Sequence, residues 1–536
     1  MIKKTSVGLL VNSKNLTYST WNLIERSLKS EHYEIKHIFI NGDVKRKISL
    51  NKVFFWLITK IERIFLIFQK NLRESLEVKN LDDYKINYTF INPKFKNNYT
   101  IYYEDRELDK IKNLKLDVLI RSQGNSILHG KILSLCKYGV LSFHHGDTSH
   151  YRGGPRGFWE VFENNEVSSY IIQRLTEKID NGVILLKGDI LTSSTYLVNS
   201  CRLLIKANFF MHDLLVKINN SNDSFVSHKN ELHYYPIRKV PKFFDTAKYI
   251  CIIFNRLFQK FTNKFFFKRK WRVALSISEN FDNISFNESI EVETSSKNFI
   301  ADPFLISHND RKILFVEEFI NSQKKGVISA YEVLINNKKI VTKNLGVVIE
   351  EGFHLSFPYV FKDQNKIYMV PESENNKDIR LYECIKFPLE WKLKKVLIKN
   401  ISAGDNVIFK RNNLWWLLTN LDSSMLVDNH SELHIYYSTD LLGNWKPFKN
   451  NPIFNTSTCA RNAGLLLNDK KIIRLFQKHK INEYGKSVGG AEIQTLNIND
   501  YSEKNIISIN PDFMRNNKRI HTLSICQNLV AFDFYR

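Results

Sequence analysis

The stretch LSFHHGDTSHYRGGPRGFWEVFENNEVSSYIIQRLTEKIDNGVIL, residues 141–185, decides the fold and the chemistry expected of the first half of the chain. Residues 139–143 form an apolar run that is typical of a short buried strand, and His144 and His145 follow it directly. In an open α/β sheet, ligands bind beyond the carboxyl ends of the strands. The sequence therefore predicts a functional site at the end of this strand.

A carboxylate follows at what we expect to be a second strand end. Asp180 begins an Asp-Asn-Gly turn just beyond the β-rich run SSYIIQRLT. An imidazole titrates near neutral pH, and a neighbouring carboxylate orients the ring and raises its basicity. We therefore predict that His144 and Asp180 form an acid-base pair. The alternative is that the histidine is structural and that Asp-Asn-Gly serves only as a turn.

The motifs of this stretch resemble those of the formyltransferases that use 10-formyltetrahydrofolate, which include methionyl-tRNA, glycinamide ribonucleotide and sugar-amine N-formyltransferases. The family pattern is Asn-x-His, then Tyr-Arg-Gly, then Asp-x-Gly. It matches here at Ser142-x-His144, Tyr151-Arg152-Gly153 and Asp180-x-Gly182, with no gap between His144 and Asp180. The resemblance implies a Rossmann-like α/β domain in which His144, Asp180 and Ser142 are catalytic.

Two departures from the family pattern bear on activity. Ser142 replaces an asparagine whose amide holds the oxyanion in the family, and loss of an oxyanion donor costs about 100- to 1000-fold in rate. A polar loop replaces the usual Pro-Ser-Leu-Leu-Pro, so we expect a more polar acceptor pocket. The residues expected to contact the acceptor are His145, Asp147, Tyr151, Arg152 and Gly153, with His150 nearby. Further ligands at standard metal spacing are not evident, so we expect no metal.

The resemblance also places the cofactor. Residues 116–121 read as a buried strand, and the loop after it corresponds to the family loop that runs along the pterin. This implies that 10-formyltetrahydrofolate contacts Gln123, Gly124, Asn125 and Ser126. The alternative is that the Gly-Asn pair only makes a turn and caps a helix at 127–135.

Composition limits the class of protein. At 536 residues the chain is too long for one core. A net charge of +23 favours anionic partners such as folate polyglutamates, sugar nucleotides or lipid headgroups, whereas no arginine-rich arm, zinc finger or RNA-binding signature indicates nucleic acid. The 6 cysteines are scattered without a CxxC pair, and the first apolar run is too short for a signal peptide. We expect a cytoplasmic protein with reduced thiols.

Two basic, aromatic stretches lie at residues 46–76 and 239–272. Charged interruptions exclude a membrane span in the first, and the apolar centre of the second is about half a span long. Each is either a packing helix or an interfacial segment that rests on anionic lipid at the inner face of a membrane. The sequence leaves both alternatives open.

The second half of the chain changes to a period of two, with short strands and turns. Strand-turn-strand units begin near residues 302, 358, 405 and 462, a spacing of about 50 to 60 residues that is typical of propeller blades. Strands near the two ends of this half would form a fifth blade. We therefore predict an α/β domain at 1–235, a linker or helix at 236–269 and an all-β five-bladed propeller at 270–536.

The motifs Ala-Asp-Pro-Phe (301–304), His-Leu-Ser-Phe-Pro (354–358) and Pro-Glu-Ser (371–373) resemble the propeller at the N-terminus of plant glucosamine inositolphosphorylceramide transferases. The half as a whole resembles the propellers of arabinanase and β-xylosidase families. In those hydrolases an aspartate on the first blade is the base, and other carboxylates act as acid and modulator. The resemblance implies a pocket that contains Asp302, Glu318, His354, Glu372, Asp405 and Arg461, with Gln477 beside it.

Together the two resemblances predict formyl transfer from 10-formyltetrahydrofolate to the amine of an amino sugar, nucleotide-linked, during surface polysaccharide biosynthesis. The propeller would bind or modify the glycan. One alternative is a glycan-binding scaffold whose first domain is inactive. Another is a glycoside hydrolase or glycosyltransferase that acts through the propeller. The sequence favours no particular oligomeric state.

Overall fold

The computed structural model describes residues 3–42, 50–97, 99–124, 126–177, 182–220, 235–265, 270–278, 286, 289–294, 297–337, 339–426, 428–467, 471–513 and 517–536. The chain divides into two compact units, Met1–Leu257 and Phe258–Arg536. The division falls inside helix α7 (Phe243–Phe265), within the segment expected to be a linker or helix. Each unit has a core of its own and is described by itself.

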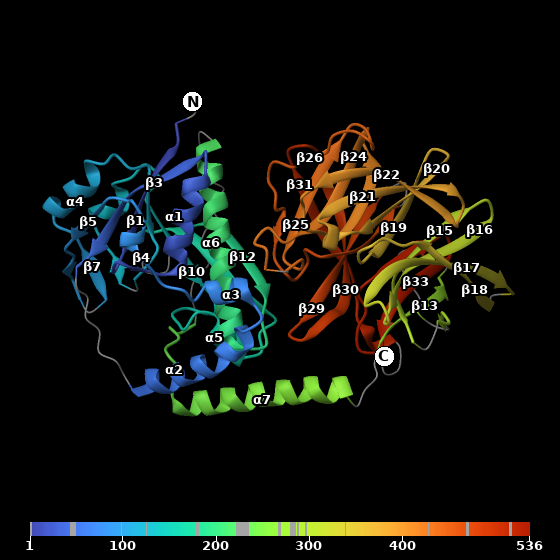
Figure 1. Cartoon of the computed structure of the whole chain (residues 1–536), viewed down its shortest axis with the longest axis horizontal. Coiled ribbons are helices and arrows are strands. Elements are labelled where there is room, and N and C mark those ends of the chain that lie inside the picture. Colours follow the sequence, from blue (N-terminus) through green and yellow to red (C-terminus); the bar gives the residue numbers. More distant parts are fainter. Residues whose placement is uncertain are drawn as a thin grey trace. The chain divides into compact units, whose positions relative to one another are not determined.

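Unit 1 is built on a seven-stranded sheet in the order β12-β11-β10-β8-β1-β3-β5 (Figure 1). The five strands from β5 to β10 in this order run parallel. β11 runs antiparallel to them, and the edge strand β12 pairs antiparallel with β11. Their bounds are β1 (Thr5–Val11), β3 (Tyr33–Asn41), β5 (Tyr88–Ile91), β8 (Val118–Arg121), β10 (Val140–His145), β11 (Val167–Arg174) and β12 (Val183–Leu191). The chain leaves β1 toward β3 on one side and later continues from β8 to β10 on the other, which makes a topological switch point beside β1.

Helices cover both faces of this sheet. Helices α1 (Tyr18–Lys29) and α6 (Tyr196–Asn220) contact each other over one face. On the other face, α4 (Asp105–Lys112) and the turn η3 (Lys131–Ser134) pack into one apolar cluster with residues of β1, β3 and β8. The short elements between them are β2 (Asn15–Leu16), β4 (Lys79–Asn80), η2 (Leu81–Asp83), β6 (Lys94–Phe95), β7 (Thr100–Tyr102) and β9 (Ile127–Leu128).

The helix expected at 127–135 is absent from the described residues there, which instead form β9 and then η3. Gly130 lies between the two elements with a φ of +87°, a conformation that glycine adopts readily and that ends a regular helix. The apolar periodicity of this segment therefore serves a strand followed by a 3₁₀ turn.

The first basic stretch forms α2 (Leu50–Glu62), the turn η1 (Arg63–Leu66) and α3 (Lys70–Glu74), which contact α6. The strand-end loop after β10 leads to the short helix α5 (Phe158–Phe162). Among the described residues, none of the helices combines the length and the apolar content that crossing a membrane requires.

Unit 2 consists of five antiparallel sheets of four strands, the third with an additional short strand. The first holds β15 (Phe299–His308), β16 (Arg311–Ile320), β17 (Lys325–Asn336) and β18 (Lys339–Ile349); the second β19 (Ser356–Asp363), β20 (Lys366–Glu372), β21 (Asp378–Lys386) and β22 (Glu390–Lys399). The third holds β23 (Ala403–Arg411), β24 (Leu414–Leu421), β25 (Glu432–Ser438), β26 (Lys446–Pro447) and β27 (Phe454–Asn455); the fourth β28 (Asn462–Leu467), β29 (Ile472–Lys480), β30 (Glu483–Leu496) and β31 (Tyr501–Ile509). The turns η4 (Glu374–Asn376) and η5 (Pro511–Phe513) complete the set.

The fifth sheet joins the two ends of the unit. It places β14 (Ile290–Glu291) and β13 (Trp271–Ile277) beside β33 (Leu529–Tyr535) and β32 (Leu523–Cys526). The inner strands β15, β19, β23, β28 and β32 contact one another in a closed ring. This arrangement is a five-bladed β-propeller closed by the first and last strands of the unit (Figure 1).

A bulge recurs in the inner strands. The register of β15 shifts between Ala301 and Phe304, and the same shift occurs in β19, β23 and β28. Asp302, Phe357 and Asp405 occupy the bulges of the first three blades with φ of +50°, +46° and +45°. A bulge redirects a side chain, and a non-glycine residue keeps such a φ only where its surroundings determine it. The bulges of blades one and three therefore present aspartates at equivalent positions.

Candidate functional sites

The first candidate site lies at the carboxyl edge of the sheet in unit 1. Because β1, β8 and β10 run parallel as neighbours, the loops that follow them meet at this edge. A cavity of about 670 Å³ opens there, which is within the range of small-molecule sites. Its wall is largely polar and includes Asn12, Thr17, Ser19, Glu77, Arg121, Ser122, Gln123, Gly124, Ser142, His145 and Arg156.

The expected cofactor loop reaches this cavity in part. The Gln123 side chain accepts from the Asn12 backbone N–H at 3.4 Å, which ties the loop after β8 to the loop after β1. Gly124 has a φ of +103°, and a Cβ there would lie 2.8 Å from the Asn12 amide nitrogen, so a side chain would be both strained and crowded. Ser126 is buried and does not line the cavity. Asn125 lies outside the described residues.

The two adjacent histidines differ in their surroundings. The lining residues include Ser142 and His145, whereas His144, which pairs with Ile171 of β11, is not among them. The Nε2 atom of His145 is buried without a hydrogen-bond partner in the described part of the chain. Burial, then the charges of Arg156 and His144, hold the pKa of His145 well below its usual value. The His145 ring is therefore neutral and able to bond a ligand. Asp180 lies outside the described residues.

Two arginines in the cavity wall were missed by the sequence analysis. Arg121 ends β8, and Arg156 donates from Nε to the Ser200 hydroxyl at 3.0 Å. Burial lowers the pKa of Arg156, but a guanidinium stays charged near neutral pH. Guanidinium groups recognise carboxylates and phosphates, so the cavity suits a ligand with an anionic part. Arg121 follows an apolar strand and Arg156 stands in a Gly-Pro-Arg-Gly turn, and no motif marks either of them as a ligand contact.

The loop expected to hold the acceptor is tied to the protein itself. Burial works against the charge of Asp147, but hydrogen bonds from Ser149 and an ion pair with Lys187 at 2.9 Å hold its pKa below the usual value. The Tyr151 hydroxyl donates to Glu163 at 3.0 Å, and burial raises the pKa of Tyr151 to about 12. Both side chains thus fix the loop in this structure.

The remaining residues of this loop enclose very little space. His145, Tyr151, Arg152 and Gly153 surround a void of about 10 Å³, which has room for one water molecule. Gly153 has a φ of +93° and lies so close to the Arg238 carbonyl that a Cβ would stand 2.2 Å from it. This void is therefore too small for a sugar.

A buried carboxyl of unit 1 also escaped the sequence analysis. Glu160 of α5 borders the same void as His145, and its Oε1 atom is buried without a hydrogen-bond partner in the part of the chain that the structure describes. Burial raises the pKa of Glu160 to about 7. It can therefore exchange a proton near neutral pH. In the sequence, Glu160 is marked only by being a glutamate next to Trp159 on an otherwise apolar helix.

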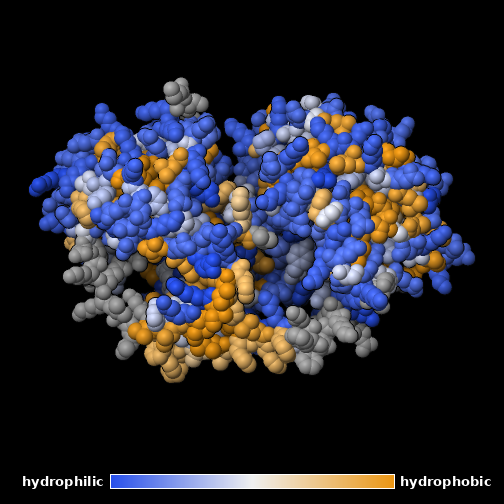
Figure 2. Space-filling model, in the orientation of Figure 1, coloured by the Kyte–Doolittle hydropathy of each residue, from blue (hydrophilic) through white to orange (hydrophobic). Residues whose placement is uncertain are grey.

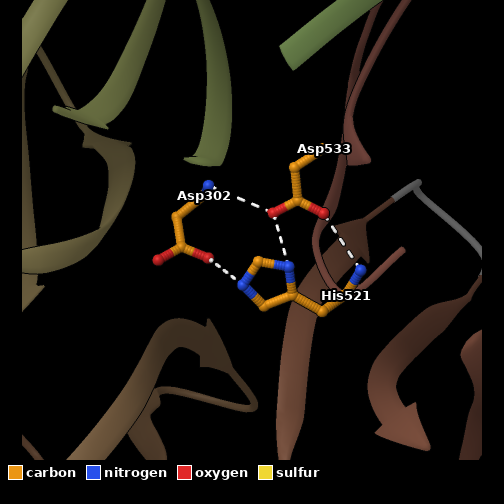
Figure 3. A group of neighbouring side chains, drawn as sticks. All are labelled: Asp302, His521 and Asp533. Atoms are coloured by element: carbon orange, nitrogen blue, oxygen red, sulfur yellow. Dashed lines mark hydrogen bonds and ion pairs between the residues drawn. The ribbon is translucent and has the colours of Figure 1, made fainter. Parts of the chain in front are cut away.

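The second candidate site lies among the inner strands of the propeller. Figure 3 shows His521 between Asp302 and Asp533, with Nε2 at 3.2 Å from the first carboxylate and Nδ1 at 2.8 Å from the second. The Thr522 hydroxyl donates to Asp302 at 2.7 Å. Burial opposes the charge of His521, but Asp533 and Asp302 raise its pKa to about 10. His521 is therefore a buried cation at neutral pH, and despite burial it holds the pKa of Asp302 below its usual value.

These three side chains also have the types and spacing of metal ligands, since their ligand atoms lie within 4.8 Å of one another. The sequence analysis expected no metal in the chain. A metal ion at this position would have to displace the protons of His521, because a ligating imidazole must be neutral. The imidazolium itself supplies positive charge between the two carboxylates.

Three further carboxyls gather nearby: Glu317, Glu372 and Asp405. Burial and the neighbouring Asp302 raise the pKa of Glu317 well above its usual value, and burial and Asp405 do the same for Glu372. Arg461 pairs with Asp405 at 2.5 Å and approaches Glu372 at 3.8 Å. Burial also raises the pKa of Asp405, whereas that of Asp302 lies below its usual value. Neighbouring carboxyls whose pKa values are pushed in opposite directions are an arrangement that serves acid-base chemistry.

The structure brings together most of the propeller residues named from the sequence, with one correction. His354 lies 3.4 Å from Glu317, and Gln477 donates to Asp405 at 2.9 Å. Glu318 instead accepts from Asn298 and Ser329, away from this cluster. Successive residues of a strand face opposite sides, so the adjacent Glu317 takes the position that Glu318 was expected to fill.

The buried His521 predicts a pH dependence of propeller stability. Its pKa is about 10 in the folded chain against an ordinary 6.5, so its contribution is complete below pH 6.5 and is lost as the pH rises through 10. The free energy of unfolding should fall by several kcal/mol over this window, an order-of-magnitude value. Urea unfolding of the propeller at pH 6.5 and 10 measures it. His521→Gln should remove most of the fall and His308→Gln should not; equal profiles for all three proteins would contradict the assignment.

Comparison with known proteins finds similarity to two kinds of protein. Residues 282–527 match the family described as glucosamine inositolphosphorylceramide transferase 1, N-terminal. The glucosamine inositolphosphorylceramide transferase 1 of Arabidopsis thaliana is 37% identical over 209 residues, which are 38% of this chain and 27% of that protein. The methionyl-tRNA formyltransferase of Bacillus licheniformis is 31% identical over 87 residues, which are 16% of this chain and 28% of that protein.

Among solved structures, the exo-beta-1,3-galactanase of Phanerochaete chrysosporium with beta-1,3-galactotriose is 12% identical, with a TM-score of 0.31, over 39% of this chain and 53% of that one. The matches to the curated relatives span 27% and 28% of their lengths, so most of each relative has no counterpart in the match. The propeller thus contains a region similar to the N-terminal part of glucosamine inositolphosphorylceramide transferases, and a short part of the chain is similar to a formyltransferase.

Proposed function

We propose that unit 1 transfers a formyl group from 10-formyltetrahydrofolate to the amine of a nucleotide-linked amino sugar, and that the propeller binds the glycan. The observation that carries the proposal is the strand-end cavity, whose wall contains Ser142, His145, Gln123 and Gly124 where the formyltransferase motifs stand. The similarity to methionyl-tRNA formyltransferase supports it. We place the reaction in the cytoplasm, in the biosynthesis of a surface polysaccharide.

The cavity fits the proposed ligands. Its volume of about 670 Å³ is within the range of small-molecule sites. The backbone at Gly124 has no side chain that would keep the flat pterin ring of the folate away. The Nε2 atom of His145, which is buried without a partner in the described part of the chain, can form a hydrogen bond with the ligand. Arg121 and Arg156 suit the carboxylates of a folate or the phosphates of a nucleotide-linked sugar.

The resemblance to formyltransferases gives three residues distinct roles. The Ser142 hydroxyl donates to the oxygen that becomes negative when the amine attacks. His144 at the end of β10 carries the proton, and Asp180 orients its ring and receives the proton that the amine releases. When bound, 10-formyltetrahydrofolate supplies the formyl carbon, which gains a bond to the acceptor nitrogen as its bond to N10 breaks and N10 takes up a proton.

Incubation of the purified chain with 10-formyltetrahydrofolate and a panel of nucleotide-linked amino sugars tests the proposal. We expect tetrahydrofolate release together with an acceptor that gains one formyl group. If no acceptor in the panel is formylated, and wild type and His144→Ala release tetrahydrofolate equally, the proposal fails.

Ser142, in the oxyanion position, leads to the prediction that one substitution makes formyl transfer faster. Ser142→Asn installs an amide donor that reaches further than a hydroxyl, and the cavity beside Ser142 leaves room for it. We expect formyl transfer to become about 10- to 100-fold faster, because one oxyanion donor is worth at least that much. The measurement is kcat for tetrahydrofolate release. Ser134→Asn, on the exposed surface of unit 1, is the matched control; an unchanged or lower kcat for Ser142→Asn would contradict the assigned role.

A second candidate function places chemistry in the propeller. The observation that favours it is the neighbourhood of Glu317, whose pKa is raised, and Asp302, whose pKa is lowered, because cleavage or transfer of a glycosidic bond needs one carboxyl as acid and one as base or nucleophile. Asp302→Asn and Glu317→Gln separate the candidates. Loss of glycan processing with intact formyl transfer would support catalysis in the propeller, whereas intact processing in both variants would exclude it.

A further inference from the structure

A large apolar surface covers one side of unit 1, over α2, the residues after it and the first part of α7. Figure 2 shows apolar residues gathered over these elements. Trp56 is 54% exposed, Phe68 97%, Phe244 82% and Phe254 71%. The other exposed apolar residues of this surface are Val53, Phe54, Leu57, Ile61, Ile64, Phe65, Ile67, Phe243, Ile250 and Leu257. Soluble proteins seldom expose so many large apolar side chains together, so we call this set the apolar face and ask what covers it.

The apolar face is continuous across the two helices. The rings of Phe54 on α2 and Phe243 on α7 lie 5.1 Å apart in an edge-on contact. On the inner side, the Tyr249 hydroxyl bonds the buried carboxyl of Glu62, which also accepts from the Leu197 backbone at 2.6 Å. This buried network fixes α2 and α7 to each other and to α6.

The inner network also fixes which side of α2 is exposed. Glu62, a charged residue, points inward and is bonded there, while its neighbour Ile61 points outward. Ile58 of the same helix is already buried, and rotating the helix to bury Ile61 as well would break the bonds of the buried Glu62 carboxyl. The exposed apolar side is therefore the stable orientation of α2.

Positive charge borders the apolar face. Exposed cations on or beside it are Lys60, Arg63, Lys70, Lys242 and Lys248. The Lys60 ammonium lies 4.8 Å from the Trp56 ring, and that of Lys248 lies 5.1 Å from the Phe162 ring, so both cations stay at the border of apolar surface. The acidic residues of these helices are engaged: Glu62 is buried, and Asp245 accepts from the Lys242 backbone at 2.9 Å.

We propose that unit 1 docks on the surface of an anionic phospholipid bilayer through this face. Aromatic and branched side chains enter the boundary between headgroups and acyl chains, and the bordering lysines and arginine meet the lipid phosphates. Trp56 is suited to this boundary because an indole has an apolar body and a polar N–H. The two helices lie in the interface plane and do not span it.

Vesicle co-sedimentation of the full chain tests the proposal. We expect binding to phosphatidylcholine vesicles that contain phosphatidylglycerol, weaker binding to phosphatidylcholine alone, and a fall in binding as salt screens the charges. Trp56→Ser, Phe244→Ser and Phe254→Ser combined should weaken binding at least about tenfold, since each removes a large apolar group from the interface. Leu28→Ser and Met425→Ser are matched controls, because these side chains are 74% and 75% exposed elsewhere and should change nothing.

A second variant probes the charges without touching the apolar side chains. Lys60→Gln, Lys242→Gln and Lys248→Gln combined should weaken binding to the phosphatidylglycerol vesicles and leave the weaker binding to phosphatidylcholine unchanged. Wild-type protein that does not bind the anionic vesicles would overturn the proposal, as would aromatic and lysine variants that bind as wild type does. A dimer of the wild type in sedimentation equilibrium that the three serine substitutions dissolve, without vesicle binding, would assign the face to a second copy of the chain.

Discussion

Replacing His144 by alanine is expected to lower kcat for formyl transfer by about 100- to 10,000-fold, the usual contribution of a positioned acid-base group. The chain should still bind both ligands, because the cavity wall is built from Ser142, His145, Gln123 and Arg156 and not from His144. Steady-state release of tetrahydrofolate at saturating acceptor measures kcat. His144→Gln is the companion variant, since it keeps a polar side chain at a half-buried position and cannot transfer a proton.

Variants of two other histidines serve as comparisons for the His144 variants. His145→Ala, next to it in β10, should raise KM and lower kcat by less than tenfold, because His145 contacts the ligand without carrying the proton. His129→Ala, which removes a surface imidazole bonded to Glu177, should leave kcat and KM unchanged. A larger fall in kcat for His145→Ala than for His144→Ala would transfer the catalytic role to His145 and overturn the alignment with the family motif.

Replacing Arg461 by methionine is expected to destabilise the propeller by about 3–5 kcal/mol, the cost of leaving a buried carboxylate without its cation. Arg461 bonds Asp405 through Nε at 2.5 Å and through Nη2 at 3.3 Å, and Glu372 lies within 3.8 Å. Without the guanidinium, Asp405 keeps a bond from the Gln477 amide and Glu372 one from the Asp405 backbone N–H, and neither donor carries a charge. Hydrogen exchange of the amides in β23 and β28 reports the opening free energy of this unit separately from unit 1.

The double variant Arg461→Met/Asp405→Asn should regain part of that stability, because it removes the orphaned charge as well. Asparagine also accepts the φ of +45° at this bulge more readily than most residues. Arg311→Met, which breaks an exposed pair with Glu332, should cost less than about 1 kcal/mol. A loss for Arg461→Met as small as that of Arg311→Met would show that the cluster does not depend on its guanidinium.

Local sequence patterns predicted the secondary structure of segments whose conformation depends on their own residues. The strand expected at residues 139–143 is β10 (Val140–His145), because an apolar run is what a buried strand requires. The four repeats of strand, turn and strand became the first four blades, and the repeated Asp at positions 302 and 405 marks equivalent bulges. Gly130 ended the expected helix at 127–135 through its backbone conformation, which apolar spacing does not report.

Partners that are distant in sequence were not predictable in this way. His521 and Asp533 reach Asp302 only because the last strands of the unit close the propeller beside the first blade. No motif marks either residue. The choice between Glu317 and Glu318 depends on strand register next to a bulge, and a shift of one residue exchanges the two faces.

The candidate site residues of unit 1 also fall into two groups: those that local sequence patterns indicated and those that only tertiary packing brings to the cavity. Ser142, His145, Gln123 and Gly124 reach one cavity because β8 and β10 are parallel neighbours, which their order and apolar character indicated. Arg156 and Glu160 entered the site through the packing of the loop and of α5, which no spacing rule describes. Hydrophobic periodicity showed that residues 46–76 are amphipathic, but only the buried bonds of Glu62 show that the apolar side faces out.

The most direct test of formyl transfer follows the atoms themselves. Wild-type chain is incubated with 10-formyltetrahydrofolate carrying ¹³C in the formyl group and with a nucleotide-linked amino sugar carrying ¹⁵N, and the product is examined by NMR. The account predicts a new formamide whose ¹³C signal is split by its bonded ¹⁵N, and formation of that signal about 100- to 10,000-fold more slowly with His144→Ala. A wild-type reaction in which the label stays on the folate with every amino sugar, or passes to water as formate, would contradict it.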